Sequence, residues 1–158
     1  MIYLGADHGG FELKEKLKAW FTKSKLPYID LGAYKLDPAD DYPQYAFAVA
    51  ETVVHEDDSS KPFKDRPQGI LICRSAVGVV IAANKVPGIR AVAAYDVKCA
   101  NHSRYNDDTN VLGLSGDWLN QHQAEEIIKA WLKTEFSHAP RHVRRIGQIA
   151  EKEIGKLT

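Results

Sequence analysis

The sequence predicts an α/β fold, a Rossmann-like three-layer sandwich with an about five-stranded parallel sheet between helices. The main observation is that short apolar runs alternate along the chain with segments of helical periodicity. In addition, 158 residues with 44% apolar and 27% charged side chains are the size and composition of one globular domain. The ordinary numbers of glycine (11) and proline (7) exclude collagen-like and disordered chains. We therefore expect a single domain over residues 1–158.

The first half of the chain repeats the order strand, then helix. Apolar runs predict strands at Ile2–Leu4, Tyr28–Leu31 and Gly69–Cys73. Apolar residues that recur at helical spacing predict helices over residues 11–21, 45–54 and 79–84. Because a helix follows each strand, the strands are expected to be parallel. The polar segment Glu56–Pro67 has no periodicity and predicts an exposed loop.

The second half continues this order and ends in a further helix. Strands are predicted at Arg90–Ala94 and Val111–Leu114, and helices at Val97–Tyr105 and Gln121–Lys133. A C-terminal helical extension is expected over 137–156, where a basic helix begins at Pro140. The apolar residues on one side of this helix are Val143, Ile146, Ile149 and Ile154.

Charge and cysteine content limit the function. Lys plus Arg (21) equal Asp plus Glu (21), so no overall field favours nucleic acid or an anionic membrane. The start of the chain does not read as a signal peptide, and the longest uncharged apolar stretch, Ala76–Ala83, is too short to span a bilayer. Two cysteines are too few for a disulfide scaffold. We expect a soluble, cytoplasmic protein that binds neither nucleic acid nor membrane.

In an open parallel sheet, ligands bind in the loops beyond the carboxyl ends of the strands. The chemistry is therefore predicted to lie in five such loops. Their candidate residues, in strand order, are Asp7 and His8, Asp41 and Tyr42, Cys73–Gly78, Tyr95, and Ser115–Asp117.

The first loop, from Gly5 to Gly10, is rich in glycine but matches neither the G-x-G-x-x-G fingerprint nor a Walker A loop. A nucleotide site is therefore disfavoured. Two interpretations stay open: Asp7 caps the following helix, or His8 at the helix N-terminus contacts an anion or a sugar hydroxyl.

Cys73 ends a buried strand and precedes a helix. Its thiol is expected to face backbone N–H groups and the positive end of the helix dipole, which favour the thiolate. The alternative is that Cys73 is a small buried apolar residue. Cys99 lies within a predicted helix without such surroundings, so a structural role is preferred for it.

Basic residues cluster at the start of the terminal helix. Arg141 and Arg145 are four residues apart and share a face, where they can hold a phosphate from two sides. A solvated basic face is the alternative. His138 and His142 have the spacing of a metal pair, but no third ligand is evident nearby, so no metal site is predicted.

With these residues placed, the chain resembles the ribose-5-phosphate isomerase B family, which includes the subunits of galactose-6-phosphate isomerase. The resemblance extends over nearly the whole chain, in the family's order. The segments that carry it are Gly5–Lys14, Asp41–Pro43, Gly69–Cys73, Ala82–Ala91, Asn106–Leu112 and Arg141–His142.

The resemblance implies an aldose–ketose isomerase that needs neither metal nor cofactor and acts on a small sugar phosphate through a cis-enediolate. It implies that Cys73 moves a proton between carbons 2 and 1, and that Ser75 and the N–H groups of residues 76–78 stabilise the enediolate oxygen. The residues implied to hold the substrate are Asp7, His8, Asp41, Tyr42, Arg74, Val77, Gly78, Asn106, Asp107 and Asn110, with Arg141 and Arg145 for the phosphate. The family's pocket is shared between two subunits, so a homodimer or a dimer of dimers is expected.

Three places in the chain, with four residues, depart from the family pattern. Arg74 and Ala76 replace glycines beside the cysteine, Asn106 replaces the histidine that helps to open the furanose ring, and Asp117 replaces a phosphate-binding arginine. An amide is not a general base near neutral pH. His102, one helical turn earlier on the same face, is a candidate catalytic substitute, or else an exposed helix residue.

These changes keep two alternatives to ribose 5-phosphate isomerisation open. A tetrose 4-phosphate, such as erythrulose 4-phosphate, cannot close a furanose ring and needs no ring-opening histidine. A non-catalytic sugar-phosphate-binding protein, or one subunit of a hetero-oligomer, does not need a complete catalytic set.

Overall fold

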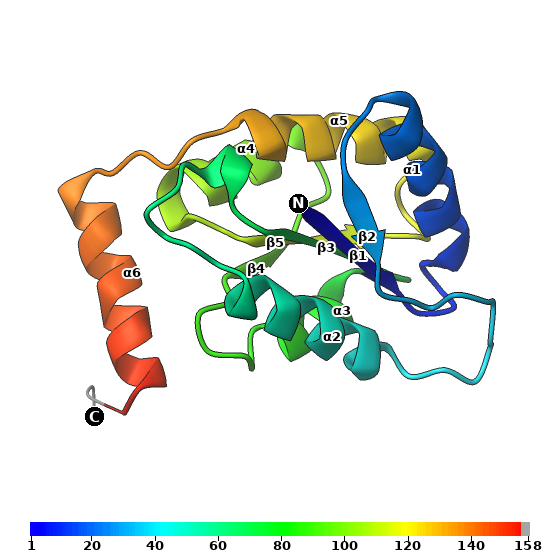
Figure 1. Cartoon of the computed structure of the whole chain (residues 1–158), viewed down its shortest axis with the longest axis horizontal. Coiled ribbons are helices and arrows are strands. Elements are labelled where there is room, and N and C mark those ends of the chain that lie inside the picture. Colours follow the sequence, from blue (N-terminus) through cyan, green and yellow to red (C-terminus); the bar gives the residue numbers. More distant parts are fainter. Residues whose placement is uncertain (156–158) are drawn as a thin grey trace.

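Five strands, all parallel, form one sheet in the order β2-β1-β3-β5-β4 (Figure 1). The computed structural model describes residues 1–155. The strands are β1 Ile2–Ala6, β2 Tyr28–Asp30, β3 Gln68–Cys73, β4 Ala91–Ala93 and β5 Val111–Ser115. The three central strands are buried along their whole length, which explains why their sequences are nearly continuous apolar runs rather than alternating ones.

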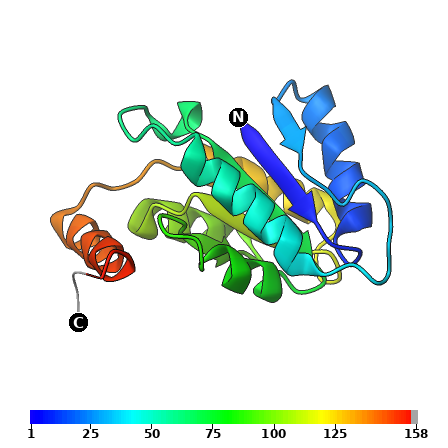
Figure 2. The same ribbon diagram turned by 60° about the horizontal axis from the view of Figure 1, so that its bottom comes forward.

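Helices cover both faces of this sheet (Figure 2). Those on one face are α1 Phe11–Lys23, α4 Val97–Asp107 and α5 Gln121–Lys133, and those on the other are α2 Tyr42–His55 and α3 Val77–Ala83. Each helical layer encloses its own apolar core against the sheet. The predicted three-layer sandwich with a five-stranded parallel sheet is thereby confirmed. Within residues 1–155, no helix is long and apolar enough to cross a membrane.

The direction in which the chain adds strands reverses between β1 and β3. From β1 the chain proceeds to β2 on one side of this pair, and from β3 it proceeds to β4 and β5 on the other side. Open α/β sheets form a ligand-binding crevice at the carboxyl ends of such a pair. Ala6 is paired with Ile72 in the sheet. The next residues on the two strands, Asp7 and Cys73, therefore lie at this switch point.

Helix α6, Pro140–Glu153, lies beside the sheet rather than on it and is joined to α5 by an extended segment (Figure 1). It contacts the rest of the chain near both ends. His142 is buried, with its Nδ1 2.7 Å from Ser137 Oγ, and Glu153 Oε2 accepts a hydrogen bond of 2.9 Å from the Gly88 N–H. The helix falls within the predicted extension 137–156, whose last residue, Lys156, lies outside the described residues.

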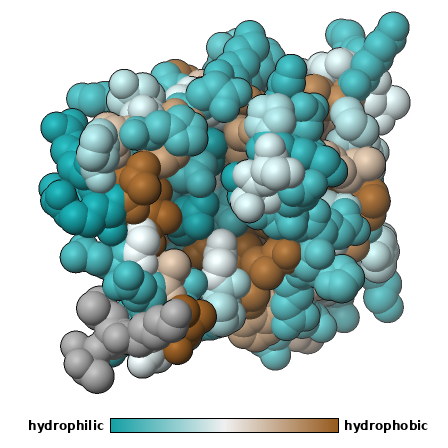
Figure 3. Space-filling view, turned by 60° about the vertical axis from the view of Figure 1, so that its left-hand side comes forward, coloured by the Kyte–Doolittle hydropathy of each residue, from teal (hydrophilic) through white to brown (hydrophobic). Residues whose placement is uncertain are grey.

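The side of the molecule that carries α6 is mainly hydrophilic, with separate apolar side chains exposed on it (Figure 3). On α6 itself, Val143 and Ile149 are about half exposed. The helix therefore presents apolar surface that its own chain does not cover.

Several predicted bounds differ from the structure by one to three residues, and two differences bear on the site and the core. α2 begins at Tyr42, three residues earlier than predicted, because Pro43 fits the first turn of a helix, where no N–H bond is needed. The segment Glu56–Pro67 contains a short 3₁₀ helix, Phe63–Asp65. The prediction of an exposed loop is wrong at Phe63, which is buried edge-on against Trp131 with ring centroids 5.3 Å apart.

Lys14, fully buried on α1, fixes the segment that follows β2. Its Nζ donates hydrogen bonds to Asp30 Oδ1 (2.7 Å) and to the Ala33 carbonyl oxygen (2.6 Å). Burial alone would raise the pKa of Asp30, but the hydrogen bonds from Lys14 and Lys18 hold this pKa below its usual value. The ion cluster therefore anchors the start of the segment that leads to Asp40.

We expect Asp30→Ala to lower the free energy of unfolding by about 3 to 5 kcal/mol, because it removes the carboxylate to which the buried Lys14 ammonium donates its hydrogen bonds. Urea denaturation near neutral pH measures this loss. The matched control is Lys129→Ala, which breaks an exposed ion pair with Glu126 and should change stability little. Equal losses in the two variants would contradict the role assigned to the buried cluster.

Candidate active site

The loops after β1, β3 and β5 meet at the carboxyl edge of the sheet because glycines let their backbones touch. A β-carbon on Gly10 would lie 2.3 Å from the Ile72 carbonyl oxygen, and one on Gly116 would lie 2.3 Å from the Gly9 carbonyl oxygen. Both distances are far below van der Waals contact, so no larger residue fits. The loops border a cavity of about 400 Å³, whose charged and histidine side chains are His8, Glu12, Arg74 and Asp117.

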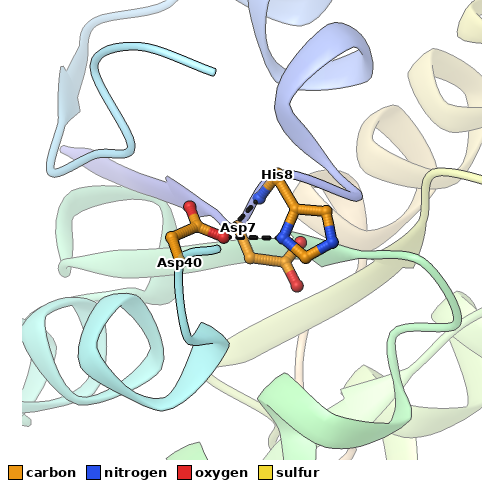
Figure 4. Close-up of side chains that lie close together, drawn as sticks. All are labelled: Asp7, His8 and Asp40. Atoms are coloured by element: carbon orange, nitrogen blue, oxygen red, sulfur yellow. Dashed lines mark hydrogen bonds and ion pairs between the residues drawn. The ribbon is translucent and has the colours of Figure 1, made fainter. Parts of the chain in front are cut away.

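Asp40 holds His8 at this edge (Figure 4). Its Oδ1 accepts a hydrogen bond of 2.9 Å from the His8 backbone N–H and lies 2.7 Å from the ring Nδ1. The Asp40 side chain is only 4% exposed. A carboxylate bound to Nδ1 fixes the orientation of the imidazole and leaves Nε2 for a ligand.

The same contact favours the charged form of His8. The hydrogen bond with Asp40 raises the pKa of His8, and the neighbouring Asp7 carboxylate acts in the same direction, whereas Arg74 opposes it. Burial raises the pKa of Asp7 itself, against the hydrogen bond of 3.0 Å that its carboxylate accepts from the Gly10 N–H. Asp7 thus closes the turn into α1, while His8 and Arg74 line one cavity together with the carboxylates of Glu12 and Asp117.

Asp7, His8 and Asp40 are also the described residues that could together hold a metal ion, since one ligand atom of each lies within 4.8 Å of the others. In this arrangement a hydrogen bond joins His8 Nδ1 to Asp40 Oδ1, and a cation bound to both atoms would have to replace it. The absence of a metal cofactor stays a prediction.

Asp40 was not among the predicted site residues, whereas its neighbour Asp41 was. Asp41 is exposed and stands at the N-cap of α2 without a side-chain capping bond. The Asp-Tyr-Pro segment is the pattern that predicts Asp41 as a site residue. The pairing of Asp40 with His8 depends on contact between two loops distant in sequence, and only the adjacent acidic residues at 40 and 41 hinted at it.

Cys73 and Tyr42 flank the loop that follows β3. Cys73 closes this strand with its side chain buried in the core beneath α2 and α3. The ring of Tyr42 lies over Gly78, where a β-carbon would come within 2.9 Å of the ring carbon Cζ. The Ser75 hydroxyl accepts a hydrogen bond of 3.3 Å from the Val77 N–H. These five predicted site residues therefore lie at one edge of the fold, and their chemical roles stay predictions.

Two of the departures from the family pattern face each other across the cavity. Arg74 Nη1 lies 3.5 Å from Asp117 Oδ2. The Arg74 side chain crosses over Gly9, where a β-carbon would lie 2.4 Å from Arg74 Cγ. The loop after β5 thus carries an anion, but a guanidinium from the loop after β3 keeps positive charge at this edge.

The remaining predicted residues lie at the opposite, amino edge of the sheet. Asn106 is in the last turn of α4, and its Nδ2 donates a hydrogen bond of 2.9 Å to the ring of His102, which shares its helix face as predicted. Asn110 precedes β5 and uses its amide within the chain. Its Oδ1 accepts from the Arg90 N–H (2.8 Å) and its Nδ2 donates to the Gly88 carbonyl oxygen (2.9 Å). Asn110 therefore braces the loop before β4.

Arg141 and Arg145 lie on α6 beside this amino edge. A cavity of about 410 Å³ lies between α6 and the segments around β4 and the end of α4. Its charged wall residues include Arg90, Asp107 and Arg145. Arg141 is exposed, with its Nε donating to His142 Nε2 (3.1 Å). Within one chain, the residues predicted to form the substrate pocket therefore lie in two sets at opposite edges of the sheet.

Comparison with known proteins identifies the family. A model of the Ribose/Galactose Isomerase family matches residues 2–149. The probable ribose-5-phosphate isomerase B of Mycoplasma pneumoniae is 41% identical over 155 residues, which cover 98% of this chain and 96% of that protein. The chain belongs to the ribose/galactose isomerase family. The ribose-5-phosphate isomerase B of Mycolicibacterium paratuberculosis is 40% identical over 152 residues, 96% of this chain and 91% of that one.

Solved structures of this family share the fold. Ribose-5-phosphate isomerase B of Mycoplasma genitalium with bound ribulose-5-phosphate matches with a TM-score of 0.88 at 36% identity, over 98% of this chain and 96% of that chain. The Clostridium thermocellum enzyme matches with a TM-score of 0.86 at 37% identity, over 97% of each chain. The family resemblance expected from the sequence is confirmed.

We expect Asp40→Asn to lower the pKa of His8, because the amide retains an acceptor but removes the negative charge. In the wild type, the pair stabilises the fold fully below the unfolded histidine pKa of about 6.5. This stabilisation is lost as the pH rises through the raised pKa of the folded protein. An NMR titration of the His8 ring measures the shift, with Asp41→Asn as the control that should leave it unchanged. An unaltered titration in Asp40→Asn would contradict the assignment.

Proposed function

We propose that the protein interconverts ribose 5-phosphate and ribulose 5-phosphate. The observation that carries this proposal is the position of Cys73 at the end of β3, at the switch point of the sheet. Cys73 directly follows Ile72, which pairs with Ala6 of β1. The loop that follows it presents a hydroxyl and backbone N–H groups. A relative of the same fold, 36% identical, has been solved with ribulose-5-phosphate bound, which supports the same substrate here.

The reaction moves one proton between neighbouring carbons. Cys73, as the thiolate, takes the proton from carbon 2 of the open-chain aldose, and the electron pair forms the C1–C2 double bond of a cis-enediolate. The thiol then returns the proton to carbon 1, while oxygen 2 gives up a proton and oxygen 1 gains one. The Ser75 hydroxyl and the N–H groups of residues 76–78 stabilise the negative oxygen formed between these steps.

The proposed reaction needs neither metal nor cofactor, because no electrons leave the sugar and hydrogen-bond donors of the chain stabilise its only transient charge. Its setting is the cytoplasm. Both cysteines are free thiols, which fits a reducing compartment.

The complete site is built from two copies of the chain. Arg141 and Arg145 lie at the edge opposite Cys73, so they serve the sugar phosphate of a second copy turned about a two-fold axis. The resulting assembly is a homodimer or a dimer of dimers. Exposed apolar side chains that this interface covers are Val77 and Ile81 on α3 and Val143 and Ile149 on α6.

A tetrose 4-phosphate is a second candidate substrate, and Asn106 is the observation that favours it. A pentose 5-phosphate closes into a furanose ring that must open before Cys73 acts, and an amide is not a general base. For a pentose, His102, whose ring Nδ1 lies 2.9 Å from Asn106 Nδ2, would have to supply the base that ring opening requires. A tetrose 4-phosphate cannot form that ring and needs neither group.

Purified protein should convert ribose 5-phosphate to ribulose 5-phosphate, and Cys73→Ser should lower kcat by about 10²- to 10⁴-fold through loss of the acid–base group. Cys99→Ser, at the other thiol, is the matched control and should stay active. A chelator should leave the rate unchanged. A higher kcat/KM for erythrulose 4-phosphate than for ribose 5-phosphate would favour the tetrose. Absence of Cys73-dependent turnover of either sugar would contradict the isomerase proposal.

Mixing two inactive variants should restore activity. Cys73→Ala removes a group at the carboxyl edge, and Arg141→Ala with Arg145→Ala removes the cations at the amino edge. After joint unfolding and refolding, about half the dimers are mixed and each has one intact site, so about a quarter of the wild-type rate is expected. A mixture of Cys73→Ala with His8→Ala, both at the carboxyl edge, should stay inactive. No recovery in the first mixture would contradict a site built from two chains.

A further inference from the structure

Ala76 has a backbone conformation that alanine rarely adopts. It precedes α3 with φ 69° and ψ −20°, in the left-handed region, and is completely buried. Glycine enters this region freely, whereas a β-carbon crowds the neighbouring carbonyl and makes it unfavourable. Something outside the loop must therefore hold Ala76 in place.

The carbonyl groups that precede Ala76 are each bound by a neighbouring loop. The Cys73 carbonyl oxygen accepts a hydrogen bond from the Gly116 N–H (2.8 Å), and the Arg74 carbonyl oxygen accepts one from the Asp117 N–H (3.1 Å). The Ser75 carbonyl oxygen accepts the third, from the Tyr95 hydroxyl (3.1 Å). Hydrogen bonds from residues that follow β4 and β5 thus hold three successive peptide groups in place.

This arrangement turns the N–H groups the other way. In a trans peptide the N–H points opposite to the C=O of the same unit. With the Ser75 carbonyl bound to Tyr95, the N–H of Ala76 faces away from Tyr95. Among residues 1–155, no hydrogen bond is donated by the N–H of Ser75, Ala76 or Gly78. These donors are therefore available to an oxygen next to Cys73.

Tyr95 is itself held in position. It follows β4, and its ring packs on that of Trp118, with centroids 5.5 Å apart and planes inclined by 47°. The backbone N–H of Trp118 donates to Ser115 Oγ (3.0 Å), and this hydroxyl in turn donates to the Arg74 carbonyl oxygen. The phenol and the loop after β5 thus brace the same three peptides.

We propose that Tyr95 is a positioning residue, a clamp that holds the Ser75–Ala76 peptide so that the Ala76 N–H points at the oxygen that becomes negative during isomerisation. The proposal rests on the proposed function. It explains how a chain with alanine at this turn keeps a loop shape that glycine would adopt without help.

The first test is Tyr95→Phe, which keeps the ring on Trp118 and removes the hydroxyl. With ribose 5-phosphate as substrate, kcat should fall about tenfold, less than for outright loss of an oxyanion donor, and KM should stay unchanged. Tyr28→Phe, in the outer strand β2 on the side of the sheet opposite β4, is the matched control and should have wild-type kinetics. An unchanged kcat in Tyr95→Phe would overturn the proposal.

The second test asks whether Tyr95 acts through Ala76. In the Ala76→Gly background the left-handed turn needs no clamp, so Tyr95→Phe should lower kcat by less than about threefold. The same tenfold loss in both backgrounds would overturn the proposal, because Tyr95 would then act by another route.

A third measurement does not depend on turnover. The coupling constant between the amide proton and Hα of Ala76, measured by NMR, reports φ. It should change in Tyr95→Phe and stay unchanged in Tyr28→Phe. A constant coupling in Tyr95→Phe would overturn the clamp even if the enzyme is an isomerase. If the wild type isomerises no sugar phosphate, the proposed function fails while this coupling still decides the role of Tyr95.

Discussion

The common direction of the five strands constrains where every functional side chain of this protein can lie. In a parallel sheet each strand ends at one edge, and each crossover returns the chain to the other edge. Asp7, Cys73 and Ser115 therefore gather at the carboxyl edge, whereas Asn106 and Asn110 are confined to the amino edge. No adjustment of side chains brings these two sets together within one chain. A catalytic centre that needs both sets therefore requires two copies of the chain, as proposed above.

Within the carboxyl edge, close backbone packing and charge act together. Glycine contacts bring the loops after β1, β3 and β5 into touch, so groups from separate strands face one cavity. Asp40 fixes His8, and Arg74 faces Asp117. Arg74 and Asp117, both departures from the family pattern, thus form one ion pair. The cation of this pair lies beside the cavity, carried by the loop after the cysteine instead of the loop after β5.

The sequence predicted the fold well because the pattern of buried strands and amphipathic helices is local. It predicted less where contact between distant segments decides the outcome. Phe63 lies in a polar segment, and only its packing against Trp131 shows that it belongs to the core. Asp40 could not be distinguished from Asp41 without the position of His8. The resemblance implies a pocket shared between two subunits, but only the topology shows which predicted residues lie at each edge of the sheet.

The most direct test of this account is a crystal structure of the protein with ribulose 5-phosphate. The account predicts a dimer in which the sugar lies against Cys73 and His8 of one chain, with its phosphate held by Arg141 and Arg145 of the other. The Ala76 N–H should face a sugar oxygen. A sugar phosphate enclosed by a single chain, or one bound away from Cys73, would contradict it.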